Sequence, residues 1–383
     1  MSLRHWLQLS LTDGIGPILI RRIVDAAGSA AAACGASATL LREIEGIGTA
    51  KASKIHQSMR AAAEEVDKEL EAAEKLGVSI ISQEDERFPL LLRSIPDPPA
   101  VLYLKGNFEP RDLNAVAIVG SRKCSYYGRE QAERFGALLA GAGVTVLSGG
   151  ARGVDSSAHR GAMSHPQGRT IAVLGSGVDV PYPPENAGLF EQIAAKGAVV
   201  SEYPLGTAPM KENFPRRNRI VSGMSRGVLV IEADERSGAL ITARQACDDH
   251  GRAVFALPGR VDSPTSAGPH KLIRDGAALV TCLEDILDGL GPLPQEAHEV
   301  SVFEPTAPAT PQAAEPVTIA YDAGLTERQR IVLAQLDGEP VHIDTLIDRT
   351  ALAANEVLQD LTLLSLKGFV KRVDGQAFVK RSR

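Results

Sequence analysis

The sequence predicts an α/β fold in which a sheet of parallel strands, covered by helices on both faces, lies between a helical N-terminal domain and a C-terminal winged helix. From about residue 70 to residue 290, apolar runs of four to six residues alternate with helical stretches, which is typical of strands buried on both faces. The composition agrees, because 44% of the 383 residues are apolar and only 4% are aromatic. No stretch approaches the roughly 20 apolar residues of a membrane span, so we expect a cytoplasmic protein that does not contact a membrane.

Residues 1–66 predict a domain of short helices built around two similar turns. Segments 13–23 and 45–55 each place a G-I-G sequence before a helical pattern that carries basic residues. The repeat resembles a helix-hairpin-helix pair, in which the glycines let the backbone approach a DNA phosphate while Lys or Arg on the next helix adds charge. A packing domain of sterile-alpha-motif type, whose glycines serve only the turns, accounts for the pattern equally well.

Residues 67–290 contain the strands of the predicted parallel sheet. Six of the seven candidate strands lead directly into Gly, Ser, Glu or a Pro-Gly pair, which places turn chemistry at their carboxyl ends. Ligands of doubly wound sheets bind outside these ends, so we expect the functional site there. The candidate strands are residues 78–82, 115–120, 144–149, 170–175, 198–202, 228–232 and 253–259.

A linker and a winged helix are expected after the sheet. Residues 291–324 are rich in Pro, Ala, Glu and Thr, a composition that cannot bury a core, and they predict a linker. Three helical segments and a hairpin around Asp374–Gly375 then predict a winged helix over residues 325–383. The third of these helices carries Glu356 and Asp360 on its polar side, where acidic residues would repel a DNA backbone.

Basic residues are concentrated in one segment of an otherwise acidic chain. The net charge is 41 minus 47, or −6, which argues against a protein that coats nucleic acid through bulk positive charge. Within residues 211–226, five basic residues face one acidic residue. Pro215 is suited to the first turn of a helix, whose outward amides and positive dipole attract phosphate. The five basic residues are Lys211, Arg216, Arg217, Arg219 and Arg226.

Helical phasing divides the arginines of this segment. At 100° per residue, the apolar residues of segment 220–224 define an inward face that also contains Arg217. An inward guanidinium needs an anionic partner, either a carboxylate at a strand end, such as Glu202 or Glu232, or a bound phosphate. The arginines that point off this face, and that we expect to be free for a ligand, are Arg216 and Arg219.

Two glycine-rich turns add a candidate phosphate cradle. The segment Gly120–Arg122 ends one predicted strand, while Gly149 and Gly150 follow the next strand and precede Arg152. Glycine permits close approach of a backbone to a ligand, and each arginine supplies charge. These turns therefore predict an anion site that the basic segment completes.

The sequence lacks the patterns that catalysis and cofactor binding require. Neither turn carries the G-x-G-x-x-G fingerprint of dinucleotide binding or the G-x-x-x-x-G-K-[ST] loop of ATPases. The eight histidines show no metal-ligand spacing, and no serine lies in a G-x-S-x-G elbow. We therefore expect a protein that is not an enzyme, with no catalytic residue, no metal and no cofactor.

Six motifs together resemble the DNA-processing protein A family, also called DprA or Smf. They keep the order and spacing of that family: IVGSR (118–122), SGGARGVD (148–155), FPRRNRIVSGMS (214–225), SGALITA (237–243), ALPGR (256–260) and GPHKLIRDGA (268–277). The resemblance implies an extended Rossmann fold between a sterile-alpha-motif-like domain and a winged helix. It also implies a homodimer that binds and protects single-stranded DNA and loads the RecA recombinase onto strands that enter the cell in natural transformation.

The resemblance assigns roles to individual residues. Arg122 and Arg152 match positions that family members use on DNA phosphates, and segment 217–219 matches the family's R-N-R signature. With the residues inferred from charge and turn chemistry, the predicted DNA-binding set is Gly120, Ser121, Arg122, Gly149, Gly150, Arg152, Lys211, Arg216, Arg217, Asn218 and Arg219. Because the family's dimer surface lies late in the Rossmann domain, Leu272 and Ile273 are candidate dimer contacts, although Leu272 suits the core equally well.

Two alternatives remain for the function. A related Rossmann group splits nucleoside monophosphates with a Glu that follows a glycine-rich segment, whereas residues 232–246 read EADERSGALITARQA without that carboxylate. The other alternative is a duplex-DNA binder that acts through the terminal domains. Few aromatic residues lie near the motifs, so we expect phosphate contacts rather than base stacking, and little sequence preference.

Overall fold

The computed structural model describes residues 2–292, 327–336, 341–350, 370–374 and 377–380, together with positions 352, 357, 360, 361 and 364. The chain divides into two compact units, Met1–Glu304 and Pro305–Arg383. The expected linker, residues 291–324, lies outside the described residues except for its first two positions. Among the helices described, none is both long and apolar enough to cross a membrane.

Five helices precede the sheet: α1 (Ser2–Leu11), α2 (Pro17–Ala27), α3 (Ala30–Cys34), α4 (Ala38–Glu43) and α5 (Thr49–Lys75). Each G-I-G turn joins two helices, α1 to α2 and α4 to α5. The first glycine of each turn has a positive φ, 84° at Gly14 and 89° at Gly46, a conformation that favours glycine. The second glycines, Gly16 and Gly48, directly precede α2 and α5.

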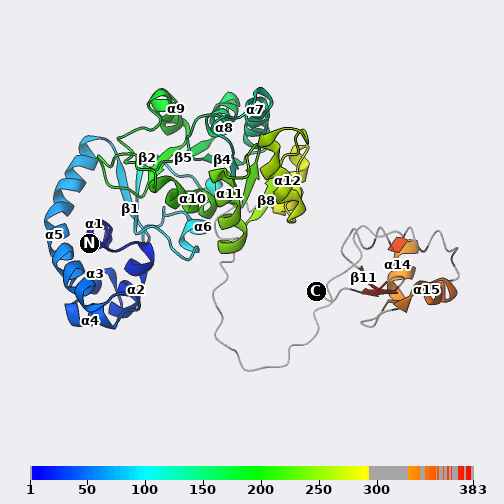
Figure 1. The fold of residues 1–383 in the computed structure, drawn as a ribbon, viewed down its shortest axis with the longest axis horizontal. Helices are drawn as coiled ribbons and strands as arrows, with labels where there is room; N and C mark the ends of the chain where they lie inside the picture. The colour runs from blue at the N-terminus through cyan, green and yellow to red at the C-terminus, as the bar shows by residue number, and fades with distance from the viewer. Residues whose placement is uncertain are drawn as a thin grey trace. The chain divides into compact units, whose positions relative to one another are not determined.

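The helical domain and the sheet share a core. Buried residues of α1, α2, α4 and α5 pack with Val101 and Tyr103 of β2 (Val101–Gly106). The first strand, β1 (Ser79–Ser82), pairs with β2, and Figure 1 shows α5 leading toward it. The boundary expected after residue 66 falls inside α5, which continues to Lys75.

Nine strands form one sheet in the order β1-β2-β6-β5-β4-β3-β7-β8-β9. The neighbours from β6 to β9 in this order are parallel, whereas β2 pairs antiparallel with both β6 and β1, so β1 again runs in the direction of the parallel strands. All seven predicted strands are present, and the sequence pattern misses β2 and the short β9 (Ala278–Leu279). The remaining strands are β3 (Ala115–Val119), β4 (Thr145–Ser148), β5 (Thr170–Val173), β6 (Ala198–Ser201), β7 (Gly227–Val230) and β8 (Ala253–Ala256).

Helices cover both faces of the sheet (Figure 1). Alternate residues of β3 enter different cores, because Ala117 packs on one face and Val116 and Ile118 pack on the other. The helices on the Ala117 side are α6 (Leu90–Arg93), α10 (Asn213–Gly223) and α11 (Gly238–Arg244). Those on the opposite side are α7 (Tyr126–Gly141), α8 (Val154–Ser164), α9 (Ala187–Lys196) and α13 (Leu283–Leu290).

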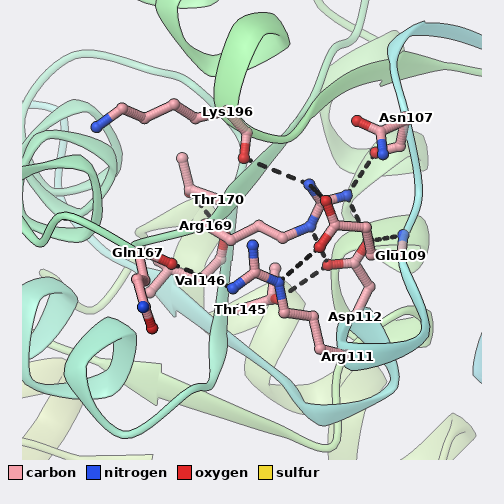
Figure 2. A network of polar contacts seen from close by, with 10 residues as sticks. All are labelled: Asn107, Glu109, Arg111, Asp112, Thr145, Val146, Gln167, Arg169, Thr170 and Lys196. Carbon is pink, nitrogen blue, oxygen red and sulfur yellow. Dashed lines mark hydrogen bonds and ion pairs between the residues drawn. The ribbon is translucent and has the colours of Figure 1, made fainter.

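A buried arginine ties the amino ends of three parallel strands together (Figure 2). Arg169, which directly precedes β5, is 2% exposed and donates through Nε to Asp112 Oδ1 at 2.6 Å. Its Nη1 donates to Glu109 Oε1 at 3.1 Å and to the carbonyl of Lys196 at 3.3 Å. Asp112 also accepts the hydroxyl of Thr145 at 2.8 Å. The charge of Arg169 is thus paired, and the segments before β3 and β5 are fixed to each other and to the first residue of β4.

The second unit contains described helices and a three-stranded antiparallel sheet in the order β10-β12-β11. Asp360 corrects an expectation: it is 1% exposed and accepts a hydrogen bond from Arg328 Nε, so it does not lie on a polar surface. The rest of the predicted third helix falls largely outside the described residues. The elements are α14 (Glu327–Ala334), α15 (Ile343–Thr350), β10 (Val341–His342), β11 (Val370–Asp374) and β12 (Ala377–Lys380).

Candidate nucleic-acid interface

A cleft of about 700 Å³ lies at the carboxyl ends of β3 and β7. The strand order reverses between these neighbours, because β4, β5 and β6 follow on the side of β3 while β8 and β9 follow on the side of β7. Doubly wound sheets bind ligands at such a reversal. The lining comes from the loops after β3, β4, β5, β6 and β7, from α10 and α11, and from the start of α8.

The structure brings most of the predicted site residues to this cleft and leaves four of them outside it. Those that line the cleft are Gly120, Ser121, Arg122, Gly149, Lys211, Arg217 and Asn218. Those that do not are Gly150, Arg152, Arg216 and Arg219.

The loop after β3 brings both backbone and charge to the cleft. The N–H of Ser121 donates to the carbonyl of Glu232 at 2.6 Å, which ties the ends of β3 and β7 together. A Cβ on Gly120 would lie 2.8 Å from the same carbonyl, so the turn requires glycine. Arg122 is exposed, and its guanidinium lies 5.3 Å from the centre of the Phe214 ring, within cation–π range.

Glu232 fixes the start of α7. Its buried carboxylate accepts the N–H of Ser125 at 2.7 Å and the hydroxyl of Ser125 at 2.6 Å, and Ser125 is the N-cap of α7. The sequence offers Glu232 as a partner for Arg217, and the structure shows that it is engaged elsewhere. The β3 and β7 ends and α7 are therefore one connected assembly.

The two glycines after β4 have different roles. A Cβ on Gly149 would overlap the guanidinium of Arg217, so glycine lets the loop backbone lie directly on this side chain. Gly150 has a φ of 69°, and its carbonyl accepts Asn186 Nδ2 at 3.0 Å. A Cβ on Gly150 would meet the ring of Phe190. Gly150 thus shapes the loop without lining the cleft.

Arg152 lies next to the cleft in a smaller pocket that it shares with Arg122, Tyr182 and Phe214. Its side chain is 56% exposed and forms an ion pair with Glu185, which is 50% exposed. Exposed pairs of this kind contribute little stability.

Arg217 is buried, as helical phasing predicts, and is 4% exposed. It donates through Nη1 to the carbonyl of Val173 and interacts electrostatically with Asp155, which takes the place of the expected Glu202 or Glu232. Burial lowers the pKa of Arg217 to about 10, so the side chain remains positively charged at neutral pH. Burial also raises the pKa of Asp155, against the opposing influence of Arg217.

Arg219 is not free for a ligand, contrary to the prediction. It is 6% exposed, its Nε lies 3.2 Å from Asp97 Oδ2, and its guanidinium also pairs with Glu202. Helical phasing identifies only the side of α10 that faces the sheet. A second side of α10 is covered by the segment before β2, which carries Asp97, and Arg219 lies on that side. Arg216 is exposed and borders a separate pocket with Arg219 and residues 14–20.

An aromatic pair lines the cleft beside Lys211, which is exposed, and the half-buried Asn218. The rings of Tyr182 and Phe214 have centres 5.5 Å apart and are tilted by 44°. The sequence argument against base stacking omits Tyr182. Its place in the P-Y-P-P segment after β5 is the signal that could have identified it.

The lining of the cleft has a net positive charge. Its basic residues are Arg122, Lys123, Lys211 and Arg217, and its acidic residues are Asp155 and Asp234. In the described part of the chain, no group of three or more His, Cys, Asp or Glu residues is arranged to hold a metal ion. The arrangement can hold phosphate groups and flat rings.

The candidate dimer contacts lie on α12 (Ala267–Arg274). Leu272 is half-buried, packs against the central core and lines a further pocket of about 300 Å³. Ile273 is also half-buried. Leu272 therefore serves the core and retains surface for another contact.

Known proteins share this architecture. Residues 79–291 match the family described as DNA recombination-mediator protein A, and residues 305–376 match the DprA winged helix domain. Protein Smf of Synechocystis sp. is 34% identical over 98% of this chain and 98% of its own length. The crystal structure of DNA processing protein A from Streptococcus pneumoniae has a TM-score of 0.65 and 33% identity, covering 75% of this chain and 98% of that chain. The Helicobacter pylori structure, which describes a single-stranded DNA binding mode, has a TM-score of 0.50 and 31% identity, covering 56% of this chain and 95% of that chain. This chain therefore belongs to the DNA recombination-mediator protein A family.

Proposed function

We propose that this chain binds single-stranded DNA in the cleft at the ends of β3 and β7 and delivers the strand to the RecA recombinase. One observation carries the proposal: distant loops bring the exposed cations Arg122 and Lys211 and the rings of Tyr182 and Phe214 into one cleft. Cations bind backbone phosphates, and rings stack with unpaired bases. The single-stranded DNA binding described for the Helicobacter pylori relative supports the same class of ligand.

A single strand suits the cleft better than a duplex. In a duplex the bases are stacked and paired, and proteins read their edges with a helix or ribbon that enters a groove. The rings of Tyr182 and Phe214 lie inside the cleft lining, where only a base freed from its stack can reach them. Stacking tolerates every base, so the rings add affinity while sequence preference stays small.

Arg217 supports binding from beneath the loop. The backbone of Gly149 lies against the guanidinium of Arg217. The positive charge of Arg217 therefore acts at short range on a phosphate bound on the other side of this loop. Because Arg217 is 4% exposed, little water surrounds its guanidinium, and its charge is less screened than that of an exposed arginine. Arg122 and Lys211 make the direct phosphate contacts in this proposal, and Arg217 adds a fixed positive potential.

The proposal includes a homodimer and a contact with RecA. Family membership supports both, and the pocket beside Leu272 supplies a surface for a second copy. Two clefts on one strand would raise affinity through effective concentration. Analytical ultracentrifugation of Leu272→Asp should show monomers, and its melting temperature separates a lost contact from a lost fold. Failure of the wild type to accelerate DNA-dependent ATP hydrolysis by RecA would contradict the recombinase part alone.

No enzymatic step belongs to the proposal. Glu232 is the carboxylate at the end of β7, and both of its oxygens accept hydrogen bonds from Ser125. A role in fixing α7 accounts for it. Incubation with AMP tests the alternative, since adenine released by the wild type and not by Glu232→Gln would establish a hydrolase.

Fluorescence anisotropy with labelled single and double strands of equal length tests the binding proposal. The variant carries Arg122→Ala and Lys211→Ala. The slope of log affinity against log salt is about −0.7 per phosphate neutralised on a single strand. Loss of two contacts should therefore flatten the slope by about 1.4 and weaken binding about 25-fold at about 0.1 M salt.

Arg134→Ala is the matched control for this experiment. Arg134 is an exposed arginine of α7 that does not line the cleft, so the variant should bind like the wild type. Unchanged single-strand affinity in the double variant would refute the cleft as the binding site. Equal affinity of the wild type for single and double strands would refute the preference for single strands.

A further inference from the structure

A second basic surface lies beside the cleft, between the starts of α7 and α8. It is a groove of about 360 Å³, called here the α7–α8 groove, and its lining contains five basic side chains and no acidic one. The basic residues are Arg122, Lys123, Arg129, Arg152 and Arg160, all of them exposed. In a chain with a net charge of −6, this local excess produces a positive potential that attracts anions.

Three of these cations are available for a ligand. Across the residues that the structure describes, no ion pair or hydrogen bond engages the side chain of Lys123, Arg129 or Arg160, although the backbone N–H of Lys123 donates to Ser121 Oγ. Other exposed arginines of the same unit have acidic partners, and examples are Arg4 with Asp67, Arg87 with Asp85, Arg111 with Glu109 and Arg260 with Asp262. The groove is therefore a place where positive charge is left without a protein counterion.

The groove is continuous with the cleft. Arg122 lines the cleft, the small pocket beside it and the groove. Arg152 lines the small pocket and the groove. These two side chains thus connect the three cavities into one basic track, which begins among the rings of Tyr182 and Phe214 and ends at Arg129 and Arg160.

Glycines hold the walls of the groove at a fixed separation. A Cβ on Gly136 of α7 would collide with the carbonyl of Ala158 of α8, and a Cβ on Gly161 would collide with the carbonyl of Glu133. The two helices therefore touch backbone to backbone. At the start of α8, Gly153 has a φ of 78°, and a Cβ there would lie 2.5 Å from the carbonyl of Ser121. The cations are carried on a rigid frame that is built before any ligand arrives.

We propose that the α7–α8 groove binds phosphates of the same DNA strand that occupies the cleft, so that the strand continues past Arg122 and Arg152 toward Arg129 and Arg160. The inference rests on the proposed function and extends its site. No aromatic residue lines the groove, and its other lining residues are Cys124, Gly153, Ser156 and Ser157. The groove therefore adds affinity through the backbone phosphates and adds no preference for particular bases.

The experiment compares two lengths of oligothymidylate, of about 5 and about 25 nucleotides, chosen because single-strand sites cover about 4 to 16 nucleotides. The variant carries Arg129→Ala and Arg160→Ala in the full chain, and Arg134→Ala on α7 is the control because Arg134 lies outside the groove. The short strand should bind the variant like the wild type. The long strand should bind about 25-fold more weakly at about 0.1 M salt, with a salt slope flatter by about 1.4.

The outcomes separate the groove from the cleft. If the long strand keeps its affinity and slope in the Arg129→Ala, Arg160→Ala variant, the groove inference is wrong while the cleft stands. If Arg122→Ala with Lys211→Ala leaves both strands bound as before, the proposed function fails and the inference fails with it. Weaker duplex binding without weaker single-strand binding would assign the groove to a duplex and overturn the proposal. Equal melting temperatures for variant and wild type confirm that the comparison concerns binding.

Discussion

The Arg219→Ala variant should lose stability because two poorly exposed carboxylates would lose their cation. The side chains of Arg219, Glu202 and Asp97 are 7%, 12% and 28% exposed. Removal of one partner from a buried ion pair costs about 3–5 kcal/mol. The unfolding entropy is about 2.1 cal/mol/K per residue, or about 0.6 kcal/mol/K for the unit Met1–Glu304. The melting temperature should therefore fall by about 5–8 °C.

The difference in melting temperature between the Arg219→Ala variant and the wild type should become smaller at acidic pH. Burial raises the pKa of Asp97 and of Glu202, and Arg219 opposes the rise, so both pKa values rise further in the variant. A carboxyl whose pKa is higher in the folded state contributes stability that is complete below its unfolded pKa, about 4, and is lost as the pH rises through its folded pKa. Acidification from neutral pH thus protonates the abandoned carboxyls and narrows the gap to the wild type.

Thermal unfolding followed by circular dichroism at about pH 7 and about pH 5 measures both effects. Arg134→Ala is the control, because Arg134 is an exposed arginine of α7 and surface substitutions usually change stability by less than about 0.5 kcal/mol. If Arg219→Ala melts like the control at neutral pH, or if its deficit grows on acidification, Arg219 is not the counterion of these carboxylates.

Three further predictions concern single side chains. Gly149→Ala should lower the urea midpoint of unfolding, because the added methyl group would overlap the guanidinium of Arg217. Gly188→Ala is the control and should not lower the midpoint, because a Cβ there meets nothing within 4 Å. Equal midpoints for the two variants would contradict this prediction. Phe214→Leu should weaken single-strand binding, measured by fluorescence anisotropy, by about 1–3 kcal/mol. The slope of log affinity against log salt should not change, because base stacking releases no counterions. A changed slope would count against stacking on Phe214. Burial lowers the pKa of His159 to about 3, so its neutral ring contributes stability that is complete above about pH 6.5 and is lost as the pH falls toward 3. His159→Gln should therefore flatten the acid side of the stability curve, and an unchanged acid side would show that another group controls it.

The strands of the core could be predicted because each parallel strand is buried on both faces and leaves an apolar run in the sequence. Of the two missed strands, β2 does contain a buried apolar run over residues 101–104, and only β9 lacks one. β9 consists of two exposed residues, Ala278 and Leu279, so no buried apolar run in the sequence indicates a strand there. In the nine-stranded sheet, β2 runs against the other strands, and its antiparallel pairing with β1 and β6 is a tertiary contact that no local pattern records.

The site could be predicted as a group of residues, because parallel strands bring the loops at their carboxyl ends to one edge. The hydrogen-bond and ion-pair partners of the individual side chains could not be predicted. Arg219 is held by Asp97, which precedes a strand that the pattern misses. Glu232 binds Ser125 across 107 positions of sequence. Helical phasing was right for Arg217, whose neighbours belong to the sheet, and wrong for Arg219, because α10 has a second covered side.

The continuous helix α5 determines where this protein can be cut. A fragment that begins at residue 67 would start inside α5 and would lack the side chains of Met59 and Val66, which are buried in the core shared with β2. Val101 and Tyr103 of β2, now 1% and 0% exposed, would then face solvent as an apolar patch that promotes aggregation. The helical domain is thus an integral wall of the sheet domain, and a fragment that keeps this wall begins with α1.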